Sequence, residues 1–124
     1  MEINLERQTY KYQPHIYAGA SGDFNPIHID PEFAKAVGFE RNIMHGLCTM
    51  AFVAQACVNS AGGDPRKLKR LKVRFASPML VEQKVTISGS ESSCENGVAT
   101  LSIEAQNDVG ETVISRAEAD IEVS

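Results

Sequence analysis

The chain has 124 residues, with 43% hydrophobic and 23% charged residues and a formal net charge of −4 at pH 7. This length and composition predict one globular domain, residues 1–124, with enough apolar surface for a core. The negative charge argues against a nucleic-acid-binding protein, because such proteins usually carry a basic face.

The N-terminus and the cysteines indicate a reducing, cytoplasmic setting. Residues 1–12 lack the basic lead and apolar core of a signal peptide. The longest apolar run, residues 47–58, is shorter than the ~20 residues that cross a bilayer. Cys48, Cys57 and Cys94 have no CxxC spacing, and the first two lie in that run, which favours buried free thiols over a nucleophile. We therefore expect a cytoplasmic protein without a membrane segment.

The N-terminal part is predicted to form a strand and then a short helix. Residues 3–12 alternate loosely between apolar and polar side chains, which predicts a strand. Pro14 suits the first turn of a helix that runs to about Ala20. Gly22 can adopt the left-handed conformation that ends such a helix. Residues 23–29 are then expected to form an irregular loop.

Two further helices are predicted from their start and stop signals. The sequence Asp30-Pro31-Glu32 provides an N-cap, a proline at the first helical position and an acid in the first turn, and Gly38 ends this helix. A longer helix from Gly46 to about Ala61 is apolar on more than one face, which predicts that it is buried. Gly62-Gly63 ends it.

The remainder of the chain is predicted to form strands that build an antiparallel sheet. The expected strands are residues 71–75, 81–87, 98–105 and 112–123, and Glu95-Asn96-Gly97 is a hairpin turn. One face of the last strand is expected to consist of Val113, Ser115, Ala117, Ala119, Ile121 and Val123. The small residues in the middle of this face leave room for a helix, so we expect an α+β fold with one buried helix on the sheet.

Asp23 and His28 are the candidates for acid–base chemistry. Five residues apart, they would diverge by about 140° on a helix and would face opposite sides of a strand. Asn25-Pro26 between them favours an irregular turn, because the residue before a proline is pushed out of the helical region. A turn can bring the two side chains together, and the spacing therefore predicts a proton-transfer site.

The hexapeptide Asp23-Phe24-Asn25-Pro26-Ile27-His28, followed by His45-Gly46, resembles the MaoC-like hydratase/dehydratase family, which includes the (R)-specific enoyl-CoA hydratases. The similarity covers residues 17–52, with weaker support from residues 74–78. It implies a hot-dog fold, in which a curved antiparallel sheet wraps around a long central helix, usually in a dimer. Residues 79–84 depart from the family, whose members tend to have a Pro-Gly-Asp turn there.

The resemblance also implies roles for single residues. Asp23 and His28 match the catalytic pair that holds one water against the β-carbon of a trans-2-enoyl thioester. Asn25 matches a position that supports the loop and the water, and Gly46 matches the amide that binds the thioester carbonyl. His45 is expected to form hydrogen bonds at the helix entrance, and we group it with Asn25 and Gly46 as substrate-binding. A glycine amide at a helix N-terminus suits a developing oxyanion, because the unpaired N–H groups and the helix dipole favour negative charge.

The implied substrates are acyl thioesters of coenzyme A or of a phosphopantetheine carrier protein, with no nicotinamide, flavin or metal cofactor. The basic residues 67–74 are either a solvated strand edge or a contact for the phosphates of such a carrier. A metal site made of His28, Asp30 and His45 is an alternative that lacks recognisable ligand spacing.

We expect a homodimer, because a single hot-dog of this length leaves a sheet edge and a pocket wall incomplete. The function that this resemblance favours is (R)-specific hydration of enoyl thioesters and the reverse dehydration. Two alternatives stay open, a hot-dog acyl thioesterase and a non-catalytic acyl-binding or partner subunit.

Overall fold

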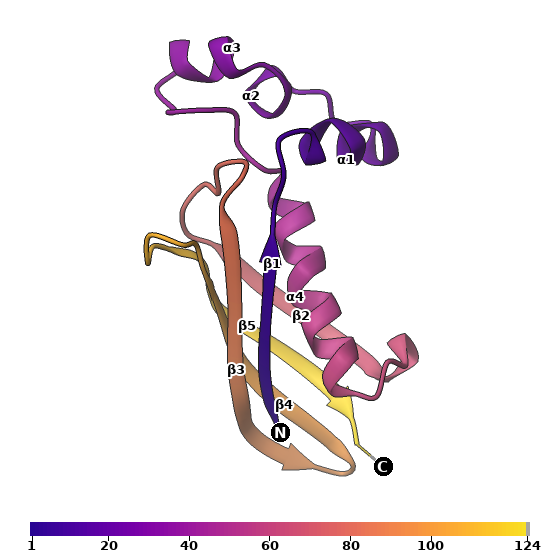
Figure 1. Ribbon diagram of the computed structural model, residues 1–124. Coiled ribbons are helices and arrows are strands. Elements are labelled where there is room, and N and C mark those ends of the chain that lie inside the picture. Colours follow the sequence, from indigo (N-terminus) through magenta and orange to yellow (C-terminus); the bar gives the residue numbers. More distant parts are fainter. Residues whose placement is uncertain (124) are drawn as a thin grey trace.

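The computed structural model describes residues 1–123 as a five-stranded antiparallel sheet with a long helix on one face. The strands are β1 (Glu2–Gln8), β2 (Leu68–Phe75), β3 (Lys84–Glu95), β4 (Val98–Gln106) and β5 (Thr112–Glu122), in the spatial order β1-β3-β4-β5-β2. The helix α4 (Gly46–Ser60) runs along the sheet (Figure 1). This confirms the predicted α+β arrangement. Within the described residues, no helix is long and apolar enough to cross a membrane.

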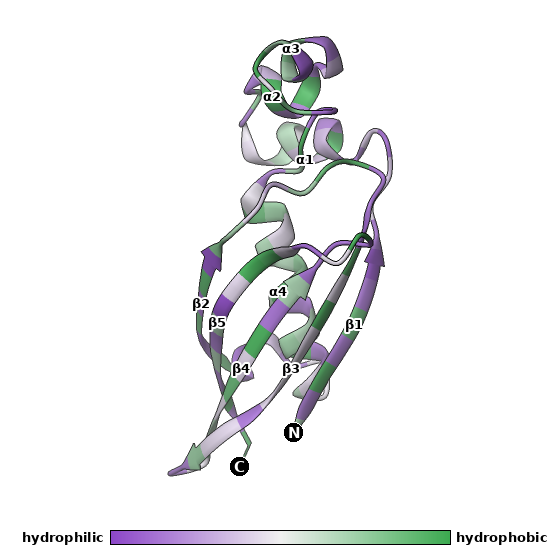
Figure 2. Cartoon of the chain, turned by 90° about the vertical axis from the view of Figure 1, so that its left-hand side faces the viewer, coloured by the Kyte–Doolittle hydropathy of each residue, from purple (hydrophilic) through white to green (hydrophobic). Residues whose placement is uncertain are grey.

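The core lies between α4 and the sheet face that it covers. Figure 2 shows the alternation of hydrophobic and hydrophilic residues along the strands, which gives the sheet one apolar face. Fully buried residues of this core are Val53, Cys57, Val85, Ile87, Leu101, Ala117, Ala119 and Ile121. The alanines of β5 have short side chains, which lets the helix pack closely against the middle of the sheet. The predicted burial of Cys48 and Cys57 is confirmed.

The predicted face of the last strand is wrong at Ser115, where β5 contains a bulge, and at Val123. Arg116 has a φ of 48°. On either side of it, Ile114 pairs with Ala105 of β4 and Ala117 pairs with Ile103. The two β5 residues are three positions apart, whereas their β4 partners are two apart. The extra residue reverses the alternation. Ile114 is therefore fully buried and Ser115 is not, and Val123, which is 41% exposed, lies beyond the end of the strand.

Three short helices gather at the end of the sheet that lies beyond the N-terminus of α4 (Figure 1). They are α1 (Gln13–Ser21), α2 (Pro26–Ile29) and α3 (Pro31–Ala36). Gly22 has a φ of 79° and ends α1, as predicted. Asp30 caps α3 as predicted, because its carboxylate accepts hydrogen bonds from the backbone N–H groups of Glu32 and Phe33 at 3.0 and 3.3 Å.

Several predicted boundaries differ from the structure. The first strand ends at Gln8 rather than at residue 12, because Thr9 leaves the β1–β3 ladder and bonds through its N–H and hydroxyl to the carbonyl of Gln83. The expected strand over residues 81–87 begins only at Lys84 and runs to Glu95, and the expected strand over residues 71–75 already begins at Leu68. The expected loop over residues 23–29 contains the four-residue helix α2, which Asn25 caps.

Candidate active site

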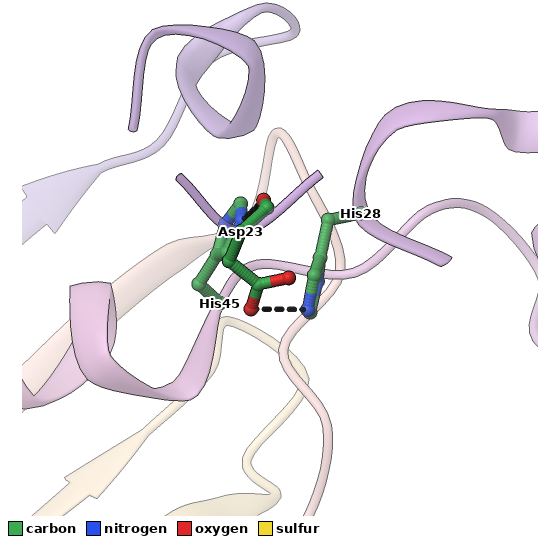
Figure 3. Close-up of side chains that lie close together, drawn as sticks. All are labelled: Asp23, His28 and His45. Carbon is green, nitrogen blue, oxygen red and sulfur yellow. Dashed lines mark hydrogen bonds and ion pairs between the residues drawn. The ribbon is translucent and has the colours of Figure 1, made fainter. Parts of the chain in front are cut away.

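Asp23 and His28 lie side by side where the chain turns between α1 and α2. The Asp23 Oδ2 atom is 3.8 Å from the His28 Nε2 atom (Figure 3). The turn is held locally, because the Asp23 N–H donates to the Ser21 hydroxyl and the Asn25 N–H donates to the Asp23 carboxylate, each at 3.2 Å. At 3.8 Å the pair is longer than a direct hydrogen bond, and one water about 2.8 Å from each atom can bridge it.

The environment of His28 defines which ring nitrogen is free. His28 Nδ1 lies 2.9 Å from the carbonyl oxygen of Ile43, and a carbonyl only accepts, so Nδ1 carries the proton. The Nε2 atom of the neutral ring then has a lone pair directed toward Asp23. The residue is 8% exposed. Burial lowers the pKa of His28, and the repulsion from His45 adds to this, while the Ile43 and Asp23 oxygens oppose it. The ring is therefore a neutral proton acceptor.

The segment before α4 fixes the position of His28 through hydrogen bonds to the backbone of α2. The Asn42 side-chain amide donates to the His28 carbonyl at 2.8 Å, and Asn42 is itself 2% exposed. The Ile43 N–H donates to the Ile27 carbonyl at 2.9 Å. Sequence reasoning identified neither Asn42 nor the Ile43 carbonyl, since both act through backbone contacts across about fifteen residues of sequence, for which no local pattern exists.

Gly46 is the first residue of α4 and lies between two cavities. One, of about 300 Å³, is lined by His28, Gly46, Thr49, Phe75 and Met79. The other, of about 290 Å³, is lined by Asp23, His45, Gly46 and Phe75 among others. The N–H of Gly46 has no partner inside the helix, since it belongs to the first turn. A Cβ on Gly46 would lie 3.1 Å from the Phe75 ring, so a larger residue would narrow this junction.

The other two predicted substrate-binding residues hold the loop in this structure. The Asn25 side chain accepts a hydrogen bond from the Ile27 N–H at 3.2 Å and so caps α2. His45 is 2% exposed, and its Nε2 lies 2.8 Å from the Asp23 carbonyl oxygen. Both residues therefore support the loop of Asp23 and His28.

Thr49 is not among the site residues predicted from the sequence. It is 3% exposed and lies on α4 at the wall of the cavity beside His28. A polar residue one turn after Gly46 in a buried helix was the signal that could have identified it.

The metal site that the sequence offered as an alternative differs in one residue from the group that the structure brings together, and neither set fits a metal well. The three groups whose donor atoms lie within 4.8 Å of one another are Asp23, His28 and His45, and Asp30 instead caps α3. The two imidazole rings are stacked, with centroids 3.9 Å apart and planes 22° apart. Lone pairs in two nearly parallel planes do not converge on one ion about 2.0 Å from each nitrogen. The side chains of these residues therefore do not fit a shared metal.

Two of the five basic residues in segment 67–74 are paired with acids. Arg70 forms ion pairs with Glu118 and Asp120 of β5, at 2.9 and 2.7 Å. Lys69 forms another with Glu122 at 3.1 Å. Of the predicted phosphate contacts, Lys67, Lys72 and Arg74 have no carboxylate within 4.0 Å in the described part of the chain. Lys72 and Arg74 lie at the end of β2 that leads to Phe75.

A curved sheet around one helix, with a histidine and a carboxylate facing each other beyond the N-terminus of that helix, defines a hot-dog protein with an acid–base site. The MaoC-like domain model matches residues 1–113. The chain belongs to this family, which confirms the predicted resemblance and hot-dog fold.

Individual relatives agree with this assignment. The chain is 36% identical over 124 residues to peroxisomal multifunctional enzyme type 2 of Drosophila melanogaster, covering 99% of this chain and 20% of that protein. It is 46% identical over 71 residues to peroxisomal enoyl-CoA hydratase 2 of Arabidopsis thaliana, covering 56% of this chain and 23% of that protein. The chain thus spans less than a quarter of the length of these relatives.

A solved structure extends the likeness over the whole chain. The (R)-hydratase from A. caviae, which is involved in PHA biosynthesis, superimposes with a TM-score of 0.90 at 24% identity. The alignment covers 100% of this chain and 95% of that one. At this identity the similarity establishes the fold.

Proposed function

We propose that this chain adds water to trans-2-enoyl thioesters to give (R)-3-hydroxyacyl thioesters, and that it catalyses the reverse dehydration. One observation carries the proposal. The free Nε2 of a buried, neutral His28 lies 3.8 Å from the Asp23 carboxylate, next to an apolar cavity. The names of the relatives, enoyl-CoA hydratase 2 and (R)-hydratase, support the same reaction.

The two side chains divide the work on one water. The water donates its hydrogens to His28 Nε2 and to the Asp23 carboxylate. These two hydrogen bonds direct a lone pair of the water oxygen at the β-carbon. As the new C–O bond forms, one of the two groups takes the water proton and the pair returns a proton to the α-carbon, so that H and OH are added in total. Both groups lie on the same side of the substrate, and the addition is therefore syn.

The thioester carbonyl is placed at the start of α4. Charge that leaves the double bond collects on this oxygen, and the Gly46 N–H stabilises it together with the helix dipole. The apolar cavity beside His28, with Met79 and Phe75 in its wall, takes the acyl chain.

The decisive assay follows crotonyl-CoA with the purified wild-type chain. The ultraviolet absorbance of the conjugated enoyl thioester should fall without release of free thiol, with or without a chelator such as EDTA. Steady absorbance with release of thiol would replace the proposal with a thioesterase. No change with enoyl chains of several lengths, on coenzyme A and on a carrier protein, would favour a non-catalytic acyl-binding subunit.

The acid limb of the pH–rate profile should lie below pH 6.5, the ordinary pKa of histidine. Burial favours the neutral form of His28 and so lowers its pKa. The neutral ring is the active form, and activity is therefore retained above the lowered pKa and lost as the pH falls through it. The measurement is kcat/KM for crotonyl-CoA between about pH 5 and 8. A limb above 6.5 that disappears in His28→Asn would contradict this assignment.

Lys72 and Arg74 are proposed to contact the phosphates of the carrier. Reversing both charges (Lys72→Glu with Arg74→Glu) should raise KM by roughly 2- to 30-fold, the effect of two exposed ion pairs, with little change in kcat. The matched control is Arg66→Glu with Lys69→Glu, which changes the net charge equally at the other end of β2. Equal effects in both double variants would mean that only the overall field of the protein acts.

The functional unit is proposed to be a homodimer. Phe24, Leu47 and Phe75, at the rim of the site, are 61%, 62% and 53% exposed. The edge strand β2 ends at Phe75 and offers unpaired backbone groups to a second copy. Light scattering should give about twice the 13.5 kDa of one chain, and Leu47→Glu should shift this mass toward the monomer. A wild-type mass of one chain would contradict the dimer.

The cytoplasmic location stays a prediction from the sequence.

A further inference from the structure

His45 holds an unusual place for a residue that begins a helix. It is the N-cap of α4, yet its side chain makes no capping hydrogen bond to the helix. The residues favoured at this position bond to the second or third amide of the helix. The imidazole of His45 instead turns to the loop of Asp23, and its Nε2 lies 2.8 Å from the Asp23 carbonyl oxygen. The first amides of α4 are thereby left free of a side-chain cap.

The same ring lies against His28. Its centroid is 3.9 Å from that of His28, with the planes 22° apart, and Tyr17 packs on it with centroids 4.9 Å apart (Figure 3 shows the two histidines and Asp23). One buried side chain thus contacts both members of the proposed catalytic pair. It holds Asp23 by a hydrogen bond to the backbone and His28 by its face.

The hydrogen bonds assign opposite tautomers to the two histidines. The Asp23 carbonyl can only accept, so His45 carries its proton on Nε2, whereas His28 carries its proton on Nδ1. His45 Nδ1 is then a buried lone pair, and it has no partner within residues 1–123. A buried polar atom without a partner costs stability, and its persistence requires an explanation. The contacts to Asp23 and His28 supply one.

We infer that His45 is a positioning residue, which fixes the distance between the Asp23 carboxylate and His28 and links this pair to the start of α4. The inference deepens the proposed hydratase function and rests on it for its kinetic part. It specifies the hydrogen-bonding role expected of His45 at the helix entrance, and it replaces the grouping of His45 with the substrate-binding residues by a role through Asp23 and His28. A misplacement of about 1 Å in such a site can cost ~10²-fold in rate.

Three substitutions separate the hydrogen bond from the ring. In His45→Gln the amide nitrogen can take the place of Nε2 and donate to Asp23. In His45→Asn it falls near the position of Nδ1 and cannot reach, and His45→Phe keeps the stacked ring without a donor. We expect Asn and Phe to lower kcat by roughly 10- to 100-fold with little change in KM, and Gln to recover most of that loss.

Two outcomes of these kinetics overturn the inference. A rise in KM with kcat intact in His45→Asn would make His45 a substrate-binding residue. Equal kcat in all three variants and wild type would remove any role in the reaction. Thermal melting of each variant shows whether a loss of kcat merely follows a loss of stability. In that case kcat of His45→Asn and His45→Gln would fall in the order of their melting temperatures.

A spectroscopic test does not depend on activity. The protein has three histidines, and His15 is exposed and serves as a reference. Two-bond ¹H–¹⁵N spectra of histidine-labelled wild-type protein should show His28 protonated at Nδ1 and His45 protonated at Nε2. The same tautomer in both rings would overturn the inference even if the chain proves to be a hydratase. If crotonyl-CoA is not hydrated but the tautomers are opposite, the proposed function fails and the arrangement of the loop stands.

Discussion

Removing the proton acceptor at either member of the pair is expected to lower kcat/KM for crotonyl-CoA by about 10²- to 10⁴-fold, the usual contribution of a positioned acid or base. The suitable changes are Asp23→Asn and His28→Asn. Asn at position 23 keeps the shape of the side chain and loses the charge. Asn at position 28 can place its amide nitrogen where Nδ1 now donates to the Ile43 carbonyl, so the loop is kept and only Nε2 is lost.

The matched control is His15→Asn, the same substitution at an exposed histidine of α1. It should leave kcat/KM unchanged. The Asp23 side chain is 54% exposed, so Asp23→Asn should also leave the melting temperature close to that of the wild type. Wild-type rates in both site variants would remove the pair from the chemistry.

Gly46→Pro is expected to lower kcat by about 10²- to 10³-fold relative to Gly46→Ala, the usual effect of losing one oxyanion donor. Proline removes the N–H that we assign to the thioester carbonyl. The backbone tolerates it, because proline is favoured at the first helical position. The preceding residue, His45, already has φ −62° and ψ 133°, which lies in the region that proline requires of its predecessor.

Alanine is the necessary control at this position. Both substitutions add a Cβ that would lie 3.1 Å from the Phe75 ring, so both narrow the junction of the two cavities. Only proline also removes the donor. Equal kcat values for the two variants would show that the Gly46 N–H does not stabilise the reaction, and any loss would then follow from the contact with Phe75.

The elements that carry local signals were predictable from the sequence. Asp30 caps α3 by accepting hydrogen bonds from the N–H groups of Glu32 and Phe33. Gly22 ends α1 with its left-handed backbone. Each signal and its effect therefore lie within a few residues. Pro26, which lies between Asp23 and His28, likewise predicted a turn that brings their side chains together. The structure places their side chains 3.8 Å apart, as that reasoning expected.

The features that the sequence did not reveal depend on contacts between distant segments. The bulge at Arg116 reverses the buried face of β5, and it is defined by the pairing with β4 and β2 rather than by the residue itself. The Ile43 carbonyl, which determines the tautomer of His28, is a backbone atom and has no sequence signature. For the same reason the sequence predicted only that His45 forms hydrogen bonds at the helix entrance and grouped it with the substrate-binding residues, and its bond to the Asp23 carbonyl emerges only from the fold.

The most direct test of the central claim, that Asp23 and His28 act together on one water, is a double-mutant cycle measured as kcat/KM for crotonyl-CoA. Groups that act as a unit give strongly non-additive losses. We expect the double variant Asp23→Asn with His28→Asn to be about as slow as the slower single variant. A double variant whose loss equals the product of the two single losses would show that the residues act independently, and would contradict a shared water.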